Sequence, residues 1–588
     1  MGARKTLPNR KDRGMALILA TIFTAVALLT VSAISGRYLQ QRLEAEAYQA
    51  YNKTFDAVET ALTTSRENLE ESRSGIIGLD GWTPQYSDKG ELVLPDFDAS
   101  ESHPVSMTAE PGTPPDQQPP QYMAYAVHWG SNGRDENGDG IADGAKEKFM
   151  YSIHAAAKYR GTVRQVESVY RATNVNVWQN AVFAGDGLAG GVIKGNVSIY
   201  GSVHILGTNL MEGGVALEDA IDLSGTSLIR NNYETLPDYL RVRVPALPTI
   251  DVDGTSAETL DAKLRVKHGL VGMTGNSQIG EAYSSGSPVK QFLDGTYVTD
   301  GWSGKKSTPD GGRGIPSDVY SDNGWSALYD LGDKVTFPLL SDPWRFPDTA
   351  AKAPRPGTAV PYTHEEYFTE VLLASPVNPT DGVHTGDINL DLTAKDAFYW
   401  NATTNVRLTG AAALAATPAA NNDYLKFDPA AATLRMNGQI RINGALSFLG
   451  QGNKDTLNYS GRCAFLVTDN ININVNLLSC NNGTPTNSAG SFPVNNCLGL
   501  MTKKDMILGA GSGASQLDIM GAFYAQNKIT SQKQTDVVGT FVSSYFDMTN
   551  QVPNIYQVPE LANSLPLGMI GNYPITTLIR VSWRELGL

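Results

Sequence analysis

The feature that most constrains this chain is a basic segment that leads directly into an uninterrupted apolar run. The basic segment ends at Gly14, and the apolar run extends from Met15 to Ile34. A helix of about 20 residues spans roughly 30 Å, which is the thickness of the hydrocarbon core of a bilayer. The pattern predicts one N-terminal membrane span with its positive flank in the cytoplasm. A secretory signal peptide fits less well, because the run is long and no A-x-A-like cleavage site follows it promptly.

The helical pattern continues beyond the span as one apolar stripe. Apolar residues recur mostly at intervals of three and four, and Gln, Glu, Lys and Arg fill the positions between them. The stripe consists of Tyr48, Tyr51, Phe55, Val58, Leu62 and Leu69. This pattern is typical of an amphipathic helix, and Ser74-Gly75 is a suitable end for it. Residues 15–75 therefore predict a single helix of about 60 residues, roughly 90 Å long, a rod suited to packing in a filament.

The junction Arg13-Gly14-Met15-Ala16-Leu17-Ile18-Leu19 resembles the processing site of type IV pilin-like proteins. Within that superfamily it is most similar to PilX-type minor pilins, and more distantly to the K-type minor pseudopilin of type II secretion. The resemblance implies that residues 1–14 are a leader, that a prepilin peptidase cuts between Gly14 and Met15, and that the new N-terminus is methylated.

One residue departs from the pattern of major pilins, which carry a Glu at the fifth mature position. Here that residue is Leu19. A carboxylate inside a bilayer is costly unless it is paired, and in the family it is thought to pair with the N-terminal amine of a neighbouring subunit. The minor tip subunits of the family often lack this Glu too, so the departure favours a minor subunit at one end of the fibre.

Composition limits what the rest of the chain can be. A chain of 588 residues has room for two or three domains beyond the helix, and its many Gly and Pro residues favour a β-rich extracytoplasmic body. The net charge of −14 argues against binding to a nucleic-acid backbone. The three cysteines are Cys463, Cys480 and Cys497. One pair is able to form a disulfide in an oxidising compartment, the pairing stays open, and the spacing is not that of zinc ligands.

Residues 76–180 predict a small β region after the helix. It begins with a proline-rich loop at 96–121. Two β-like runs, 147–159 and 162–172, then flank Arg160-Gly161 and predict a long antiparallel hairpin that packs on the helix. This hairpin is similar to the sheet that follows the helix in pilin-like proteins.

The loop before the hairpin matches the first nine positions of a calcium loop of D-x-N-x-D-G-x-x-D form. Its oxygen ligands are expected to be Asp135, Asn137, Asp139, the Ile141 carbonyl and Asp143. The twelfth position is Lys146, where an EF-hand has Glu. A bound Ca²⁺ is the preferred interpretation, and a solvated Asn/Asp/Gly turn is the alternative.

Short β repeats occupy much of residues 181–430 and 431–588. Glycines six residues apart separate short apolar runs in two places. They are Gly195, Gly201 and Gly207, and then Gly438, Gly444 and Gly450. The repeats predict a right-handed parallel β-helix-like body. A meander of hairpins that turn at Asn437-Gly438 and Asn443-Gly444 is the alternative.

Long insertions interrupt this pattern between about 208 and 430, with helical fragments expected near 255–264 and 364–373. Their aromatic residues either line a carbohydrate or partner surface or form the core of the insertion. These residues are Trp302, Trp325, Tyr329, Trp344, Phe346, Tyr362 and Tyr367. The carboxylates Asp505, Asp518 and Asp536 are scattered in sequence and match no catalytic signature, so no enzymatic activity is expected.

The sequence thus predicts an α+β, mostly β protein that acts as a minor pilin-like subunit of a type IV pilus. Before assembly it is expected in the inner membrane with its body in the periplasm, and afterwards outside the cell at the pilus tip. Expected partners are the prepilin peptidase, other minor and major pilins, and a surface or carbohydrate ligand in adhesion. A pseudopilin of a type II secretion system is the main alternative, and a membrane-anchored β-helix enzyme acting on polysaccharide is another.

Overall fold

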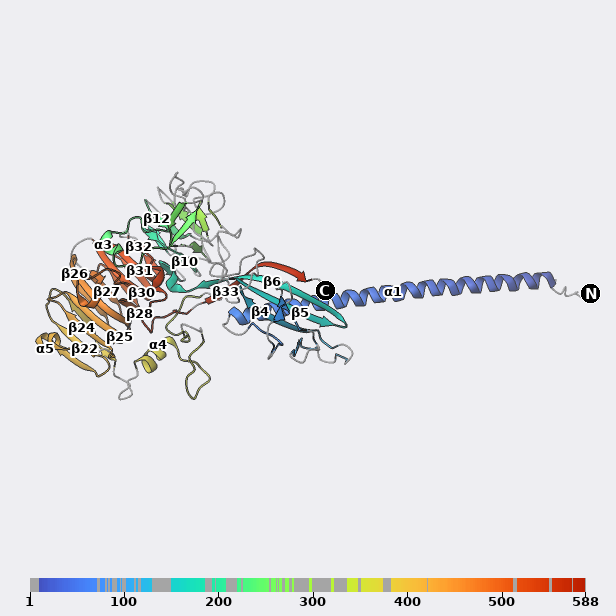
Figure 1. The fold of residues 1–588 in the computed structure, drawn as a ribbon, viewed down its shortest axis with the longest axis horizontal. Helices are drawn as coiled ribbons and strands as arrows, with labels where there is room; N and C mark the ends of the chain where they lie inside the picture. Colours follow the sequence, from blue (N-terminus) through green and yellow to red (C-terminus); the bar gives the residue numbers. More distant parts are fainter. Residues whose placement is uncertain are drawn as a thin grey trace, which may run out of the picture. The chain divides into compact units, whose positions relative to one another are not determined.

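The structure is a computed structural model (Figure 1). It describes residues 10–586 except 71–74, 80–81, 83–84, 87–91, 96, 98–101, 110–112, 115–117, 130–149, 186–192, 196, 208–218, 224–225, 253–254, 261, 263, 267–269, 274–277, 280–295, 299–318, 322–335, 347–350, 374–381, 420, 511–515, 549–552 and 574. The chain divides into two compact units, which are considered separately. The first unit contains residues 1–173 and 576–588, and the second contains residues 174–575.

The first unit begins with one continuous helix, α1 (Arg10–Glu70), of 61 residues (Figure 1). This confirms the predicted long helix. Residues 71–74, which include Ser74 of the expected end at Ser74-Gly75, lie outside the described residues. The apolar side chains of its N-terminal part are exposed, including Leu17 and Leu29 at 70 % exposure. Within the described part of the chain, this is the one helix that is long and apolar enough to cross a membrane.

The C-terminal part of α1 packs on a sheet through small residues together with Val58 and Leu62 of the predicted stripe. Its buried face is formed by Ala50, Thr54, Ala57, Val58, Ala61, Leu62 and Ser65. Tyr48 and Tyr51 stay exposed, at 68 % and 48 %. Small side chains bring the helix axis close to the strands, and the larger aromatic residues are left on the outer side. The stripe is thus divided: Val58 and Leu62 lie in the core, whereas Tyr48 and Tyr51 face outward.

The sheet of the first unit has the order β3-β4-β5-β6-β33. The strands are β3 (Val105–Ser106), β4 (Gln121–His128), β5 (Met150–Tyr159), β6 (Thr162–Val175) and β33 (Ile575–Leu586). The strands β5 and β6 form the predicted antiparallel hairpin, with Tyr159 opposite Thr162. Arg160 and Gly161 adopt φ of 48° and 83°, as a two-residue hairpin turn of type I′ requires.

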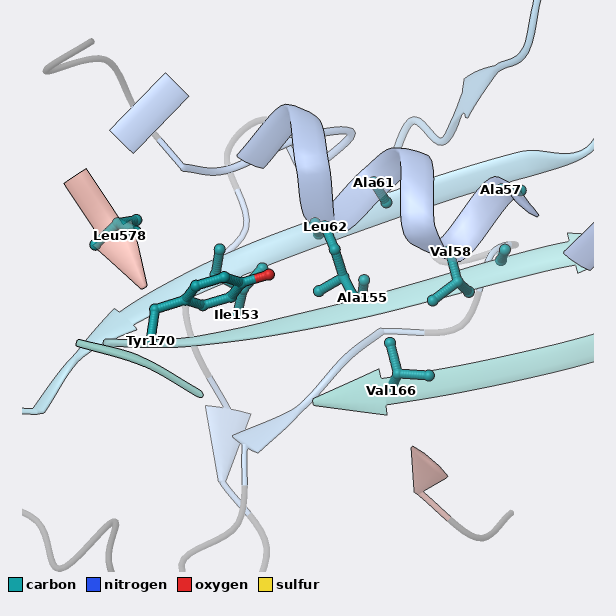
Figure 2. Packing of buried hydrophobic residues seen from close by; sticks show 11 residues of the cluster. Ala57, Val58, Ala61, Leu62, Ile153, Ala155, Val166, Tyr170 and Leu578 are labelled. Carbon is teal, nitrogen blue, oxygen red and sulfur yellow. The ribbon is translucent and has the colours of Figure 1, made fainter. Parts of the chain in front are cut away.

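Two cores hold this sheet, one on each face. Figure 2 shows the first, where Val58 and Leu62 of α1 meet Ile153, Val166 and Leu578. The opposite face is covered by residues of the segment that follows α1, which also forms a small hairpin of β1 (Gln85–Tyr86) and β2 (Leu92–Val93). The second core contains Leu79, Trp82, Leu94, Met123, Val127 and Ala156.

The last strand of the chain belongs to the first unit, which corrects the predicted domain at 431–588. β33 is an edge strand beside β6. Arg164 bonds to Glu585, and the Ser168 hydroxyl donates to the Ser582 carbonyl at 3.0 Å, so the two strands run in opposite directions. The sequence did not reveal this pairing because about 400 residues separate the two strands, and strand pairing over such distances leaves no local pattern.

In the described part of the second unit, 22 strands form one sheet with mainly parallel pairings. Its first strands are β7 (Val182–Ala184), β8 (Ile193–Gly195), β9 (Ser198–Tyr200), β10 (Val203–Ile205), β11 (Asp219–Leu223), β12 (Leu228–Arg230), β15 (Leu264–Val266), β16 (Leu270–Met273) and β17 (Gln278–Ile279). Buried residues of successive strands stack in register, as in the column Phe541, Val182, Val203 and Leu264.

The remaining strands of this sheet come from the second half of the unit. They are β20 (Val383–Thr385), β21 (Ile388–Asp391), β22 (Phe398–Asn401), β23 (Val406–Thr409), β24 (Tyr424–Asp428), β25 (Thr433–Asn443), β26 (Leu446–Val467), β27 (Ile471–Ser479), β28 (Cys497–Thr502), β29 (Asp505–Leu508), β30 (Gln516–Ser531), β31 (Gln534–Asp547) and β32 (Asn554–Tyr556). Strand β22 pairs antiparallel with β23 and β24, and β24 pairs antiparallel with β25. The other described pairings along this sheet, such as β25 with β26 and β30 with β31, are parallel.

The chain enters this stack of strands in its middle. From β7–β9 it proceeds through β10–β12 to β15–β17 in one direction. It then resumes at β20–β22 and returns through β25, β26, β28 and β30 to β31 and β32. Those two last strands pair with β7, β8 and β9. The first and last strands of the second unit are therefore neighbours.

The hairpin alternative fails at both proposed turns. Asn437-Gly438 lies inside β25, which pairs in parallel with β26 through Gly438 and Cys463. Asn443-Gly444 joins two strands that are also parallel partners. The alternating Asn residues of β27 bond to the preceding strand, as in the donation from Asn476 Nδ2 to Thr456 Oγ1 at 3.2 Å.

Short helices and small hairpins complete the second unit. The helices are η2 (Val177–Gln179), α3 (Asp238–Arg241), α4 (His364–Tyr367), η5 (Phe368–Leu372), α5 (Gly410–Ala415), η6 (Asn481–Gly483) and η7 (Pro559–Leu561). The hairpins pair β13 (Thr249–Val252) with β14 (Thr255–Glu258), and β18 (Thr296–Val298) with β19 (Val319–Ser321). The helical fragment expected near 364–373 is confirmed, whereas the one expected near 255–264 begins as strand β14.

Candidate functional site

The N-terminal part of α1 carries the predicted processing junction. Gly14 and Met15 lie in uninterrupted helix, and the Met15 side chain is 63 % exposed. Leu19 is 50 % exposed, and a Cβ placed on Gly14 or Gly36 would meet no described atom within 4 Å apart from its chain neighbours and the backbone of its own helix. This stretch therefore offers its whole apolar circumference to a membrane or to other helices. Cleavage after Gly14 stays a prediction.

Further along α1, the outer aromatic residues meet the closing strand β33. Phe55 and Trp583 make an edge-to-face contact with ring centroids 6.3 Å apart. Phe55 and Glu59 on α1, together with residues 580–583 of β33, line an open groove. We call this the α1–β33 groove. Val581 is 58 % exposed beside it, so the groove joins the exposed apolar side of α1 to the edge of the sheet.

Arg164 connects β6 to the two elements that line this groove. From β6 it donates from Nε and Nη2 to the two carboxylate oxygens of Glu585 at 2.7 and 2.8 Å. Its guanidinium lies over the rings of Tyr51 and Phe55, at 4.1 and 5.2 Å from their centroids. Nη2 also donates to Tyr51 Oη at 3.1 Å. The hydrogen bond with Arg164 holds the pKa of the Glu585 carboxyl below its usual value.

Replacing Arg164 is expected to loosen β33. Its side chain is only 5 % exposed, and Arg164→Ala removes a bidentate ion pair and two ring contacts together. We expect a loss of about 2 kcal/mol in the stability of the first unit, measured by urea unfolding in detergent. Arg164→Lys keeps the positive charge but cannot form the bidentate pair, so its stability should lie between those of the wild type and Arg164→Ala.

A matched control is Arg42→Ala, because Arg42 pairs with Glu46 on the exposed surface of α1. Exposed pairs contribute little, so this variant should unfold like the wild type. Equal stability of the Arg42→Ala and Arg164→Ala proteins would contradict the role assigned to Arg164.

A second charged group ties β33 to the sheet. Arg584 contacts Glu167, whose side chain is 7 % exposed. His154 of β5 lies directly opposite Glu167, with Nε2 and Oε1 3.6 Å apart. Burial lowers the pKa of His154, and the Glu167 charge opposes that shift only in part. The last strand is thus attached to β6 at two ion pairs.

The three cysteines are free, buried thiols in the structure. Cys463 lies opposite Leu498, and Cys497 lies opposite Arg462 on the same pair of strands. Because neighbouring residues on a strand point to opposite faces, the side chains of Cys463 and Cys497 point away from each other. Burial raises the pKa of all three thiols, which suits apolar packing better than reactivity.

Four of the predicted insertion aromatics pack mainly on one another. The rings of Trp344 and Tyr367 stack with centroids 4.5 Å apart, and Phe346 and Tyr362 meet Tyr367 edge-on. Trp344 is 3 % exposed. This arrangement is the core of a loop-rich segment, which was one of the two alternatives. Trp302, Trp325 and Tyr329 lie outside the described residues.

The predicted calcium loop, with Asp135, Asn137, Asp139, Ile141 and Asp143, also lies outside the described residues. Among the residues that the structure does describe, no group of three or more His, Cys, Asp or Glu side chains is arranged to hold a metal ion. The calcium site therefore stays a prediction.

Two of the scattered carboxylates come together in the fold. Asp518 and Asp536 are opposite each other on the parallel strands β30 and β31. Tyr239 Oη donates to Asp518 Oδ2 at 2.8 Å, and Asn554 Nδ2 donates to Asp536 Oδ1 at 2.7 Å. Burial raises the pKa of both carboxyls, and Asp518 adds to the shift of Asp536. Asp505 lies elsewhere, opposite Lys528.

Sequence reasoning missed the residues that complete the α1–β33 groove. Trp583, Arg580 and Glu585 lie in β33, which the sequence had joined to the β-helix-like body. A signal was available in the apolar–polar alternation of 579–583, which is typical of a half-exposed strand. It did not identify β6 as the partner.

The fold and this surface define a protein with one N-terminal helix able to cross a membrane, followed by a mostly β body. No model of a known protein family matches the chain, and no curated protein matches it either. Among solved structures, it is similar to the competence-associated pilin ComZ from Thermus thermophilus, with 17 % sequence identity. The match covers 91 % of this chain and 97 % of that chain, with a TM-score of 0.43. A likeness of this size does not define a family.

Proposed function

We propose that this protein is a minor pilin-like structural subunit of a type IV pilus. The observation that carries the proposal is α1: one 61-residue helix that starts at a basic segment, passes Gly14, exposes a full apolar span and ends as part of a sheet core. Such a helix serves first as a membrane anchor and then as a filament core element. Its partners are the inner membrane, the prepilin peptidase and other pilins.

A position at the pilus tip is part of the proposal. The second unit, residues 174–575, is more than twice as long as the first. A body of this size is hard to repeat along a tightly packed shaft, and Leu19 supplies no carboxylate for a neighbouring subunit inside the membrane. Both features support a subunit present in few copies at one end of the pilus, with a PilX-type role in priming assembly. At the tip, the body would be exposed outside the cell for adhesion to a surface or carbohydrate.

We further infer that the second unit is a right-handed parallel β-helix. The inference is supported by the in-register parallel pairing of strands from successive passes of the chain, such as β30 with β31 and β7 with β10. The buried apolar columns inside the stack and the Asn hydrogen bonds along β27 are further support.

The decisive experiment is mass spectrometry of the mature N-terminus in cells with and without prepilin peptidase. The proposal expects a chain that starts at Met15 when the peptidase is present and at Met1 when it is absent. A Gly14→Ala variant should interfere with cleavage, whereas Gly36→Ala, in the same helix and with equally open space around it, should be processed normally. A chain that still starts at Met1 beside an active peptidase would refute the proposal.

A minor pseudopilin of type II secretion shares the same helix and stays the second candidate. Genes for pilus assembly or for secretion beside this one would separate the two. An enzymatic body has less support, because Asp518 and Asp536 are each occupied by a hydrogen bond from Tyr239 or Asn554. Activity of the full chain on a panel of polysaccharides would overturn that view.

Calcium binding by residues 135–143 is proposed from the spacing of the oxygen ligands. We expect Ca²⁺ to raise the melting temperature of the full chain in detergent, and Asp135→Ala with Asp139→Ala to abolish the rise. No calcium effect on the wild-type protein would dismiss the site.

A further inference from the structure

Residues near the start and near the end of the second unit are hydrogen-bonded to each other. The indole Nε1 of Trp178 donates to the Ile570 carbonyl at 2.7 Å, and Asn176 Nδ2 donates to Asn572 Oδ1 at 3.4 Å. We call these four residues the end clasp. They lie close in sequence to the end of β6 and to the start of β33, although about 400 residues separate the two sides.

The end clasp is tightly packed. The Trp178 side chain is completely buried, and its carbonyl accepts a hydrogen bond from Thr540 Oγ1 at 3.3 Å. A Cβ added to Gly571 would come within 2.9 Å of Val177 Cγ2. A side chain at Gly571 would therefore displace Val177, so the two ends are closely packed at this point.

The clasp depends on completion of the stack. Phe541 of β31 pairs with Val182 of β7, and Ile555 of β32 pairs with Ile199 of β9. These pairings join the last strands of the unit to its first strands. The two ends of the unit therefore meet where its last strands pair with its first strands.

The strand that this arrangement delivers lies at the edge of its sheet. β33 is an edge strand with a partner on one side, and Arg580, Val581, Ser582, Arg584 and Glu585 are all exposed. If the clasp is open, β33 is the far end of a loop of about 400 residues, and the entropic cost of loop closure grows with loop length. If the clasp is closed, only a few residues separate the clasp from β33. The local concentration of β33 near β6 is then high.

We propose that the end clasp is a completion latch: β33 docks on β6 only when the second unit has folded through to its last strands. The α1–β33 groove would then form only on molecules with a finished body. This inference goes beyond the proposed function and does not rest on it, because it follows from the connection of the two units through β6 and β33.

Hydrogen–deuterium exchange on the full chain in detergent micelles tests the latch. We expect Trp178→Ala to speed exchange in residues 578–586 at least tenfold, while residues 150–159 of β5 keep their wild-type protection. Trp178→Phe, which keeps an aromatic ring but loses the Nε1 donor, should shift the same peptide in the same direction by less. If Trp178→Ala does not fold, the Trp178→Phe variant still tests the latch by the same measurement.

The matched controls are Trp400→Ala and Trp400→Phe. Trp400 is equally buried in the second unit but lies on β22, away from the clasp. These variants should leave exchange in 578–586 unchanged. The latch is overturned if 578–586 stays protected when the clasp peptides have lost protection, or if the Trp400 variants release β33 as strongly as the Trp178 variants.

Discussion

Mild acid is expected to destabilise the second unit through one buried histidine, His364. It is the first residue of α4, it is 4 % exposed, and Nε2 donates to the Gly568 carbonyl at 2.9 Å. Its ring lies against Trp344, with centroids 4.6 Å apart. Burial lowers the pKa of His364 to about 3, although the Gly568 hydrogen bond opposes the shift.

The sign of the effect follows from the difference between folded and unfolded states. The unfolded chain takes up the proton near pH 6.5, whereas the folded chain does not until pH is near 3. Stability is therefore complete above pH 6.5 and is lost as pH falls towards 3, by about 1.4 kcal/mol for each unit. Between pH 6.5 and 4.5 the loss should reach about 2–3 kcal/mol.

Urea unfolding of the full chain in detergent at pH 7.5 and 4.5 measures this loss. His364→Gln cannot take up the proton, so its stability should depend less on pH than that of the wild type by about 2–3 kcal/mol over this interval. His128→Gln is a suitable control, because His128 lies on β4 and is only half-buried. Parallel pH profiles of wild type and His364→Gln would show that His364 does not control the acid response.

Gly461→Ala is expected to prevent formation of the β25–β26 ladder. Gly461 lies opposite Met436, has a φ of +97°, and donates its N–H to Asn496 Oδ1 at 2.8 Å. A Cβ at this position would lie 1.8 Å from the Met436 carbonyl oxygen. Neither backbone can move away without breaking ladder hydrogen bonds, so we expect a loss of at least about 4 kcal/mol in stability or no soluble protein.

Gly386→Ala separates this clash from backbone strain. Gly386 has a similar φ of +102°, but no atom of the protein lies within 4 Å of its added Cβ. The stability lost in Gly386→Ala should therefore be limited to the strain of a left-handed backbone, about 1–2 kcal/mol. Urea unfolding of the two variants side by side makes the comparison, and equal losses would refute the importance of the contact with Met436.

The long helix and the β5–β6 hairpin were predictable because their signals are local. The apolar run from Met15 and the two β-like runs around Arg160-Gly161 each determine structure within a few tens of residues. The buried face of α1 was not predictable in the same way. Hydrophobic patterning gives most weight to large residues such as Tyr51 and Phe55, whereas the sheet accepts Ala57 and Ala61 because close approach excludes larger side chains.

The groove beside α1 could not be predicted because its parts come from opposite ends of the chain. Arg164 and Glu585 form their ion pair across 421 positions, and nothing in either neighbourhood specifies the other. The same applies to the pairing of β31 with β7. In both cases the specificity comes from shape and from the order of the strands in the finished sheet, which is a property of the whole fold.

The entry of the chain into the middle of its β stack has a consequence for how the sequence of such a protein can evolve. Its two points of attachment lie at β7–β9 and β31–β32, between the two ends of the stack. Additional strands at either far end, beyond β15–β17 or beyond β20–β22, would lengthen the body without displacing those points. The reach and the outer surface of the body can therefore diversify while the N-terminal helix and its sheet stay the same.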